Sequence, residues 1–181
     1  MRFTKMQGCG NDYIYINCFE EKVENPEKLA IAMSERHFGV GSDGLVLIMP
    51  SETGDFRMRM FNLDGSEGKM CGNGVRCVGK FVYDSGIAHK DTITVETLSG
   101  IKTLKITDKD GFADTITVDM GKAEFAPEKI PAIADCESII DTAITVNGED
   151  YNITAVSMGN PHAVTFCDEI DSLNLEKVGP H

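Results

Sequence analysis

A cysteine followed by a pair of glycines is the strongest sign of chemistry in this sequence. It lies in Met70-Cys71-Gly72-Asn73-Gly74-Val75-Arg76-Cys77, and apolar residues then recur with the period of one helical face as far as Val82. Gly86 is a typical helix stop, so the sequence predicts a helix over about residues 72–85. Cys71 then stands at the N-terminus of that helix, where unpaired N–H groups and the helix dipole attract anions and favour a thiolate over a thiol. The stretch therefore predicts a nucleophile or base beside an anion-binding site.

Gly72 and Gly74 are unfavourable for a helix that only needs to begin. Each costs about 1 kcal/mol relative to alanine where the backbone is helical, and Ser, Thr, Asp or Asn is the common choice for a cap. We interpret the two glycines as leaving the first amides of the helix open to a ligand. On this stretch alone a second interpretation stays open, in which Cys71 is a small buried apolar side chain.

Four asparagines stand at the ends of predicted strands or loops: Asn11, Asn62, Asn73 and Asn160. A carboxamide both donates and accepts hydrogen bonds, so a group of them suits a substrate that carries ammonium and carboxylate groups. Each one alone is also a typical turn residue. His162 follows Asn160 closely and could tune a thiol by proximity, although a lone histidine is more often structural.

The sequence gives little support for a metal site or for a nucleotide-binding site. The spacing Cys71-x5-Cys77 does not suit zinc and no matching pair follows, so we expect no metal site. Residues 39–44 fit the letters G-x-G-x-x-G but lead into a predicted strand, which is wrong for a dinucleotide site, and there is no P-loop. We therefore expect no cofactor. A Cys–His hydrolase built from Cys71, His162 and Asn160 stays open as an alternative.

Composition limits the class of protein. The chain has 181 residues, 41% of them hydrophobic, which suits one large or two small globular domains. A formal net charge of −12 argues against nucleic acid as a partner. No apolar run is long enough to span a membrane, and the first residues show no signal peptide, so we expect a cytoplasmic protein. The six cysteines contain no C-x-x-C pair, which favours reduced thiols.

Hydrophobic patterns predict many short strands and few helices, an α+β fold. A first helix should begin at Asn25-Pro26 and end at Gly39, with a narrow apolar face of Leu29, Ala32, Met33 and Arg36. Tight turns are expected at residues 7–11 and at Asn147-Gly148, and a loop at residues 157–162. The predicted strands are residues 2–6, 12–18, 45–49, 56–62, 92–98, 102–107, 114–120, 142–146, 151–157 and 163–167.

A change of character near residues 119–122 predicts two domains. The first covers residues 1–120 and contains the helix of about residues 72–85. The second covers residues 121–181, and with few strands and no disulfide or metal it would be marginal alone. We expect it to be the truncated first part of a larger domain.

Five motifs occur in a characteristic order, and together they resemble the diaminopimelate epimerase family over residues 2–180. The resemblance implies two similar domains, each with a β-barrel-like sheet wrapped around a central helix, and an active site in the cleft between them. It also implies a mechanism without pyridoxal phosphate in which two cysteines act on opposite faces of the substrate α-carbon. The motifs are Gly8-Cys9-Gly10-Asn11-Asp12, Gly39-Val40-Gly41-Ser42-Asp43-Gly44, Asn62-x-Asp64-Gly65-Ser66-Glu67, Cys71-Gly72-Asn73-Gly74-x-Arg76-Cys77 and Ser157-Met158-Gly159-Asn160-Pro161-His162.

The resemblance also implies roles for individual residues. It makes Cys71 one of the two catalytic thiols and His162 a residue that tunes the thiol pair. The implied substrate contacts are Asn11, Asn62, Gly72, Asn73 and Asn160. The substrate is a small molecule, diaminopimelate, and the protein is expected to be a homodimer that serves lysine and peptidoglycan precursor synthesis.

The sequence departs from the family in one important respect, because the second cysteine motif is absent. Cys77 cannot replace it, since six residues along a helix turn a side chain by about 240° and move it roughly 9 Å along the axis. We therefore expect this chain by itself to be inactive. Cys9 and Tyr13 also stand where the family leads us to expect an aliphatic residue and a phenylalanine.

Two alternatives to an epimerase of LL- and meso-diaminopimelate stay open. One is a proline or hydroxyproline racemase of the same fold, which also uses two thiols. The other is a non-enzymatic half-protein that associates with itself through exposed strand edges.

Overall fold

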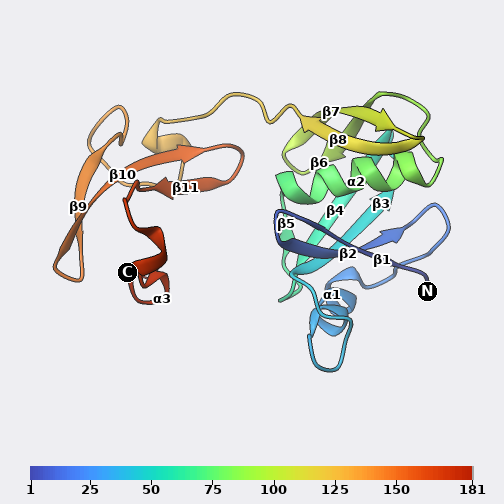
Figure 1. Ribbon diagram of the computed structural model, residues 1–181, viewed down its shortest axis with the longest axis horizontal. Coiled ribbons are helices and arrows are strands. Elements are labelled where there is room, and N and C mark those ends of the chain that lie inside the picture. Colours follow the sequence, from blue (N-terminus) through green and yellow to red (C-terminus); the bar gives the residue numbers. More distant parts are fainter. Residues whose placement is uncertain (181) are drawn as a thin grey trace. The chain divides into compact units, whose positions relative to one another are not determined.

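The computed structural model describes residues 1–180 of the chain. The chain folds as two compact units, Met1–Met120 and a second unit that begins at Gly121, and each is described by itself (Figure 1).

An eight-stranded sheet forms most of the first unit, in the order β1-β2-β3-β4-β6-β7-β8, with β5 paired to β4. Neighbouring strands are antiparallel except for β2 with β3 and β4 with β6. Parallel neighbours need a crossover connection, and the two helices of this unit lie in the chain segments that join these pairs. The bounds are β1 Thr4–Gly8, β2 Asn11–Asn17, α1 Pro26–Ser34, β3 Gly44–Met49, β4 Phe56–Asn62, β5 Glu67–Gly68, α2 Gly72–Asp84, β6 Thr92–Thr97, β7 Gly100–Lys109 and β8 Phe112–Val118.

Helix α2 lies inside the curl of this sheet (Figure 1). Strands β1 and β2 at one end and β7 and β8 at the other all contact it, so the sheet wraps around one helix. Val75, Val78 and Val82 are fully buried in the core beneath it. Gly79 allows a close approach of β7, because a Cβ there would lie 2.8 Å from a methyl group of Leu104. The α+β class, the barrel-like sheet around a helix and the helix near residues 72–85 are confirmed.

Helix α1 covers the other face of the sheet. Alternate residues of β2 explain this arrangement: Tyr13 and Tyr15 belong to the core around α2, whereas Ile14 and Ile16 pack with Ala30 of α1. A strand that is buried on both faces has a continuous apolar sequence, as residues 13–16 do.

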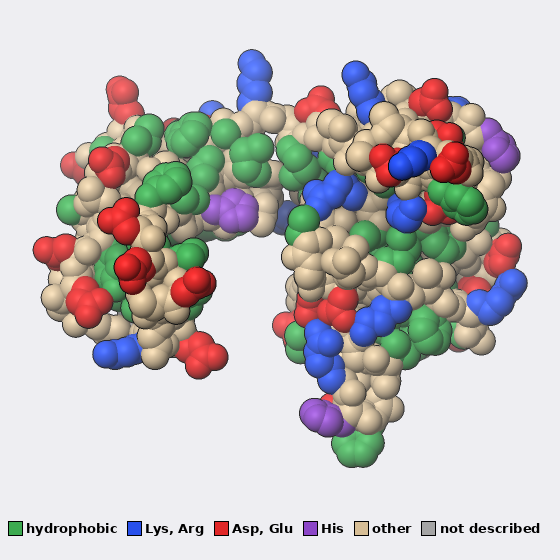
Figure 2. All heavy atoms as spheres, in the orientation of Figure 1, with side chains coloured by type: hydrophobic (Ala, Val, Ile, Leu, Met, Phe, Trp, Pro, Cys, Tyr) green, Lys and Arg blue, Asp and Glu red, His purple; other side chains and the backbone are tan. Residues whose placement is uncertain are grey.

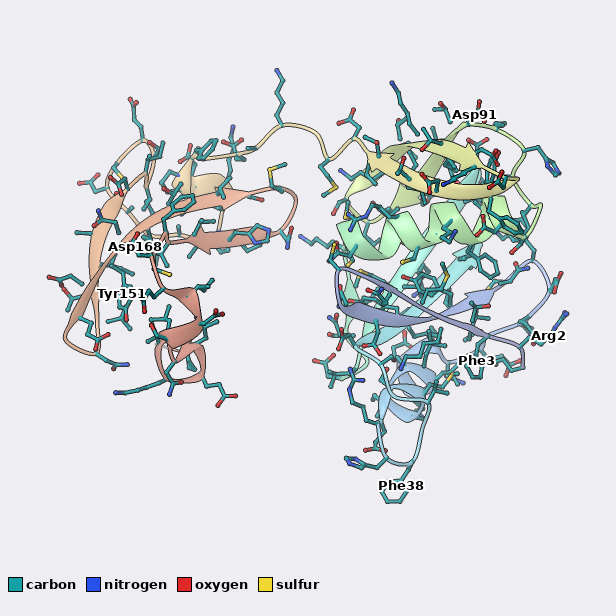
Figure 3. All side chains as sticks on the ribbon, viewed as in Figure 1. Arg2, Phe3, Phe38, Asp91, Tyr151 and Asp168 are labelled. Atoms are coloured by element: carbon teal, nitrogen blue, oxygen red, sulfur yellow. The ribbon has the colours of Figure 1, made fainter. Side chains whose placement is uncertain are left out.

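The expected end of this helix is wrong, and only two of the four residues expected on its apolar face, Leu29 and Met33, pack against the core. Helix α1 ends at Ser34, because the Glu35 backbone turns extended and its carboxylate accepts hydrogen bonds from the N–H groups of His37 and Phe38. The buried side is Pro26, Ala30 and Ser34, with Leu29 and Met33 half-buried; Ala32 and Arg36 are exposed. Figure 3 shows Phe38 at the tip of the loop that follows.

Some strand bounds also differ from expectation. The short strand β5 was not expected, and β7 and β8 are joined by a shorter turn than the pattern indicated. Asp110 and Gly111 both have positive φ, so the two strands continue up to that tight turn. As a result β8 covers Phe112–Val118 instead of residues 114–120.

The second unit contains a three-stranded antiparallel sheet in the order β11-β10-β9. Asn147 and Gly148 both have positive φ and join β9 to β10 in a two-residue turn, which confirms the expected hairpin. The last strand begins at Pro161 and ends at Val164, so the strand expected at residues 163–167 is present but begins two residues earlier and ends three residues earlier. The bounds are η1 Pro127–Lys129, β9 Thr142–Val146, β10 Glu149–Ser157, β11 Pro161–Val164, η2 Ile170–Ser172 and α3 Leu175–Val178.

Much of this unit's apolar surface is exposed. Hydrophobic side chains appear across its visible face (Figure 2), and Phe166 is 91% exposed. A cavity of about 340 Å³ lies beside β10 and β11, and most of its lining side chains are apolar, Ile130, Ile139 and Ile153 among them.

Shortening a buried side chain of α2 should destabilise the first unit. In Val78→Ala we expect the free energy of unfolding to fall by about 2 kcal/mol, because the lost methyl groups leave a cavity between helix and sheet. Urea unfolding followed by circular dichroism measures the change. Val40→Ala, at a position that is 36% exposed, should change stability by less than about 0.5 kcal/mol. Equal losses in the two variants would contradict the packing described above.

Candidate active site

Cys71 is the N-cap of helix α2. Its backbone is extended, with φ −134° and ψ 115°, and its carbonyl oxygen accepts the first helical hydrogen bond from Val75. Its Sγ accepts a hydrogen bond of 3.3 Å from the N–H of Gly74. The thiol is thus held over the first turn of the helix, partly exposed and not sealed in the core.

The amides of Gly72 and Asn73 lie next to this thiol. Neither N–H group has a hydrogen-bond partner within residues 1–180, and both residues are only half-buried. A Cβ on Gly72 would approach only Met120, at an ordinary 3.6 Å. Unpaired N–H groups at a helix N-terminus attract an anion such as a carboxylate. The expectation of a thiol beside open amides therefore agrees with the geometry.

Asn11 reaches the thiol from strand β2. The turn before it consists of Cys9 and Gly10, both with positive φ, which places Asn11 at the first position of the strand. Its Oδ1 accepts a hydrogen bond of 3.3 Å from the Cys71 thiol. Its Nδ2 donates a hydrogen bond of 2.8 Å to Asp43.

Arg76 fixes the side chain of Asn73. Its Nη2 donates to Asn73 Oδ1 at 2.6 Å and its Nη1 donates to the Gly72 carbonyl oxygen at 3.3 Å. The same Nη2 lies 3.5 Å from the sulfur of Cys9. Because the carboxamide oxygen of Asn73 is occupied, its N–H groups remain to bind a ligand. Sequence reasoning missed this role of Arg76, although a spacing of three residues from Asn73 on a helix predicts contact between the two side chains.

Tyr13 is a second residue of the site that sequence reasoning missed. Burial, and then the neighbouring Cys71, raise the pKa of Tyr13 to about 12. Its ring packs closely against Gly44, where a Cβ would lie 2.1 Å from the carbonyl oxygen of Phe61 and 2.9 Å from the Tyr13 ring. The phenol is therefore a neutral group packed beside the thiol at neutral pH.

An ion-pair cluster supports this edge of the site. Asp12 follows Asn11 and is bound by Lys5 at 2.9 Å and by Arg36 at 3.0 Å. Arg36 also binds Asp43 at 3.1 Å. Burial opposes ionisation of Asp12, but the hydrogen bonds and charges of Lys5 and Arg36 outweigh it and lower its pKa to about 2.

The remaining predicted residues lie elsewhere. Asn62 ends β4, and in the sheet register it is next to Gly44, which in turn is next to Tyr13. Its Nδ2 donates to Ser66 Oγ at 3.0 Å, and within residues 1–180 no hydrogen bond joins Asn62 to Cys71.

Asn160 and His162 belong to the second unit. Asn160 is exposed, and its carbonyl oxygen accepts a hydrogen bond from the N–H of Met158. His162 is exposed on β11, where it pairs with Val156, so its expected place in a loop is wrong. The structure thus brings together Cys71, Gly72, Asn73 and Asn11, which all lie in the first unit.

The family model of diaminopimelate epimerase matches residues 3–126 of the chain. The chain belongs to the diaminopimelate epimerase family. The five motifs that resembled this family therefore identified it correctly.

Relatives named diaminopimelate epimerase match almost the whole chain. The one from Acetivibrio thermocellus is 58% identical over 180 residues, which cover 99% of this chain and 64% of that protein. The one from Methanococcus maripaludis strain S2 is 54% identical over 180 residues, which cover 99% of this chain and 65% of that protein. The chain thus spans just under two thirds of the length of these family members.

Solved structures with the same fold include amino-acid racemases and epimerases. A probable proline racemase from Agrobacterium radiobacter K84, with bound carbonate, matches with a TM-score of 0.68 and 14% identity over 98% of this chain and 52% of that one. A hydroxyproline epimerase from Agrobacterium vitis, with bound trans-4-hydroxy-L-proline, matches with a TM-score of 0.63, the same identity and the same coverage. At this identity the similarity shows the fold alone.

Two features are absent from residues 1–180. No group of three or more His, Cys, Asp or Glu side chains is placed to hold a metal ion. None of the helices in this range is both long and apolar enough to cross a membrane.

The ion pairs of Asp12 should make the stability of the folded chain depend on pH in the acid range. The pKa of Asp12 is about 2 in the folded chain and ordinarily 3.8, so its stabilising effect is complete above the ordinary value and is lost as the pH falls through about 2. We expect Asp12→Asn to be less stable than the parent at neutral pH, with the difference shrinking towards about pH 2. Urea midpoints at several pH values measure it. Asp91→Asn, which removes a carboxylate that forms no salt bridge in the described part of the chain, should show no such convergence.

Proposed function

We propose that this chain provides one of the two acid/base groups of a cofactor-independent epimerase that interconverts LL- and meso-diaminopimelate. The observation that carries the proposal is the Cys71 thiol at the N-terminus of α2, beside the open amides of Gly72 and Asn73 and hydrogen-bonded to Asn11. Membership of the family, and relatives named diaminopimelate epimerase at 58% and 54% identity, support the same reaction.

The open amides suit the difficult step of this reaction. The hydrogen on an amino-acid α-carbon is a very weak acid, because its carboxylate already carries a negative charge. When that hydrogen leaves as a proton, the electron pair stays on the α-carbon and spreads onto the carboxylate oxygens. N–H groups of Gly72 and Asn73 that point at those oxygens would stabilise the growing charge, and removal of one such donor typically costs about 3 kcal/mol.

The thiol supplies the proton transfer. In one direction the Cys71 thiolate takes the α-proton, so a C–H bond breaks and an S–H bond forms, and a second group returns a proton to the opposite face. In the other direction the Cys71 thiol gives its proton to the carbon. Each turnover thus inverts the configuration of the α-carbon, because one proton leaves that carbon and another is added to its opposite face. The reaction needs no oxidant or reductant.

The asparagines would orient the substrate. Asn62 Nδ2 is held by Ser66, which leaves Oδ1 to accept a hydrogen bond from a substrate ammonium. Asn73 offers N–H groups to a carboxylate, since Arg76 occupies its oxygen. We propose that Asn160 also contacts the substrate and that His162 tunes the thiol pair, as the family resemblance implies.

The second thiol is not provided by another helix start within residues 1–180. Of the helices that the structure describes in residues 1–180, only α2 has a cysteine as its N-cap. Cys77 lies in the core on the same helix, and its burial raises the pKa of its thiol. We propose that the second thiol lies in the part of the family's length that this chain does not span, and that these 181 residues alone are inactive.

The proposal extends to partners and location. The ligand is a small molecule, and the net charge of −12 disfavours nucleic acid. A homodimer in the cytoplasm is the arrangement that we propose for the complete protein.

Loss of the thiol should abolish the reaction. In the complete protein we expect Cys71→Ala to lower the rate of epimerisation by about 10³-fold or more, because a positioned acid/base group contributes on that order. The assay follows deuterium incorporation at the α-carbon of LL-diaminopimelate in D₂O. Cys136→Ala, at an exposed cysteine of the second unit, is the matched control and should keep full activity. A Cys71→Ala protein with the wild-type rate would exclude the role, and the 181-residue chain serves as the blank.

Substrate choice separates the proposal from a proline racemase. In the same assay we expect exchange with LL- and meso-diaminopimelate and none above background with L-proline or trans-4-hydroxy-L-proline. A group of carboxamides suits a substrate with two ammonium and two carboxylate groups. Faster exchange with proline would overturn the choice of substrate and keep the thiol chemistry.

A further inference from the structure

Two carboxamides lie near the start of helix α2, and a charged side chain fixes each of them. Asn11 Nδ2 donates a hydrogen bond of 2.8 Å to Asp43 Oδ2. Asn73 Oδ1 accepts a hydrogen bond of 2.6 Å from Arg76 Nη2. Both hydrogen bonds are partly buried. The two carboxamides are therefore held by opposite ends, one by its nitrogen and the other by its oxygen.

Asp43 determines which atom of Asn11 stays available. A carboxylate only accepts hydrogen bonds, and the same Oδ2 also accepts one from the N–H of Asp12 at 3.1 Å. Arg36 binds the other carboxylate oxygen at 3.1 Å. If the carboxamide were turned over, two oxygens would face each other without a proton between them. Oδ1 of Asn11 is therefore the atom that faces Cys71, at 3.3 Å from the sulfur.

Arg76 has the reverse effect on Asn73. A guanidinium only donates hydrogen bonds, so it occupies the carboxamide oxygen and leaves the N–H groups of that carboxamide to a ligand. Arg76 Nη1 also donates to the Gly72 carbonyl oxygen at 3.3 Å, which fixes the guanidinium along the first turn of α2. The backbone amides of Gly72 and Asn73 lie on the same turn. This turn thus offers donors, whereas Asn11 offers an acceptor.

The ion-pair cluster that holds Asn11 has no net charge. It consists of two carboxylates and the two cations that bind them, namely Asp12, Asp43, Lys5 and Arg36. The direction of the hydrogen bonds therefore decides which group of a substrate Asn11 attracts. At Asn73 the positive charge of Arg76 and the direction of its hydrogen bond act together, and both favour an anion.

This arrangement matches the polarity of an α-amino acid. The α-carbon carries an ammonium, which only donates hydrogen bonds, and a carboxylate, which only accepts them. For proton transfer this carbon must come within about 3.5 Å of the Cys71 sulfur, and both groups are bonded directly to it. Asn11 Oδ1 lies at 3.3 Å from the same sulfur, and with two lone pairs it can accept from an ammonium as well as from the thiol.

We infer that Asp43 and Arg76 are positioning residues: they fix Asn11 and Asn73 in opposite orientations, so that the α-ammonium binds at Asn11 and the α-carboxylate at the start of α2. The inference rests on the proposed function. It gives the two residues different effects, because the ammonium keeps its charge during the reaction whereas negative charge grows on the carboxylate. Asp43 therefore contributes to substrate binding, and Arg76 contributes also to the rate of proton removal.

Kinetics of the complete protein with meso-diaminopimelate test this division. The new side chain in Asp43→Asn can donate as well as accept, so Asn11 can turn over. We expect KM to rise about tenfold and kcat to change less than about twofold, the pattern of lost uniform binding. In Arg76→Met we expect kcat to fall about tenfold or more. Asp91→Asn and Lys105→Met, which each remove one exposed charge elsewhere in the first unit, should keep both constants.

Equilibrium binding separates the two groups of the substrate without turnover. In a Cys71→Ala background, calorimetry compares meso-diaminopimelate with pimelate, which has the same two carboxylates and no ammonium. Asp43→Asn should weaken the binding of diaminopimelate about tenfold and leave that of pimelate unchanged. Arg76→Met should weaken both, and Arg76→Lys, which keeps a donor, should weaken both less. Asn11→Leu should act as Asp43→Asn does, and adding Asp43→Asn to it should change nothing more.

The outcomes distinguish this inference from the proposed function. An equal effect of Asp43→Asn on diaminopimelate and pimelate, or an unchanged kcat in Arg76→Met, would overturn the inference and leave the proposed function intact. The expected binding pattern without deuterium exchange in diaminopimelate would refute the proposed function and keep the inference.

A complete protein that does not bind diaminopimelate would refute both. Circular dichroism checks that each variant is folded. If Asp43→Asn does not fold, an Asn11→Leu protein that binds diaminopimelate as tightly as the parent overturns the inference.

Discussion

The structure of the first unit depends on how the N-terminus of helix α2 is capped. A helix begins with N–H groups that have no partner in the helix. Here the sulfur of Cys71 accepts a hydrogen bond from the N–H of Gly74, and the N–H groups of Gly72 and Asn73 have no partner among residues 1–180. A serine or aspartate cap would satisfy the helix more strongly. The arrangement therefore places a reactive atom and a binding site for negative charge on the same turn of backbone.

The curled sheet holds this turn in place. Both ends of the sheet contact α2, and the valines of the helix are buried against it, so the start of the helix has a fixed position relative to β1 and β2. That position brings Asn11 to the sulfur across a sequence separation of 60 residues. A second layer of polar contacts, from Asn11 through Asp43 to Arg36 and Asp12, then fixes the direction of the carboxamide. The fold thus determines both which groups meet at Cys71 and which atom of each group faces it.

Elements with a strong local pattern were predictable. The apolar period after Cys71, the stop at Gly86 and the turn at Asn147-Gly148 act over a few residues, and all three agree with the structure. The end of α1 was not predictable in this way. The Glu35 carboxylate ends that helix by accepting hydrogen bonds from the next N–H groups, and no periodic pattern records such a contact. His162 was misplaced for a similar reason, because strand β11 begins at a proline and is defined by its pairing with β10.

The sequence by itself determined the family, the catalytic candidate and the chemistry available to it. These depend on residue types at fixed short spacings, such as Cys71 with Gly72 and Asn73, whose backbone geometry follows from the helix that they begin. Only the tertiary structure decided that Tyr13 packs beside the thiol, that Arg76 occupies the oxygen of Asn73, and that Asp43 directs Asn11. The reason is physical: the direction of a hydrogen bond depends on which donors and acceptors face each other in space, and strands that are distant in sequence supply them only when the sheet has closed around its helix.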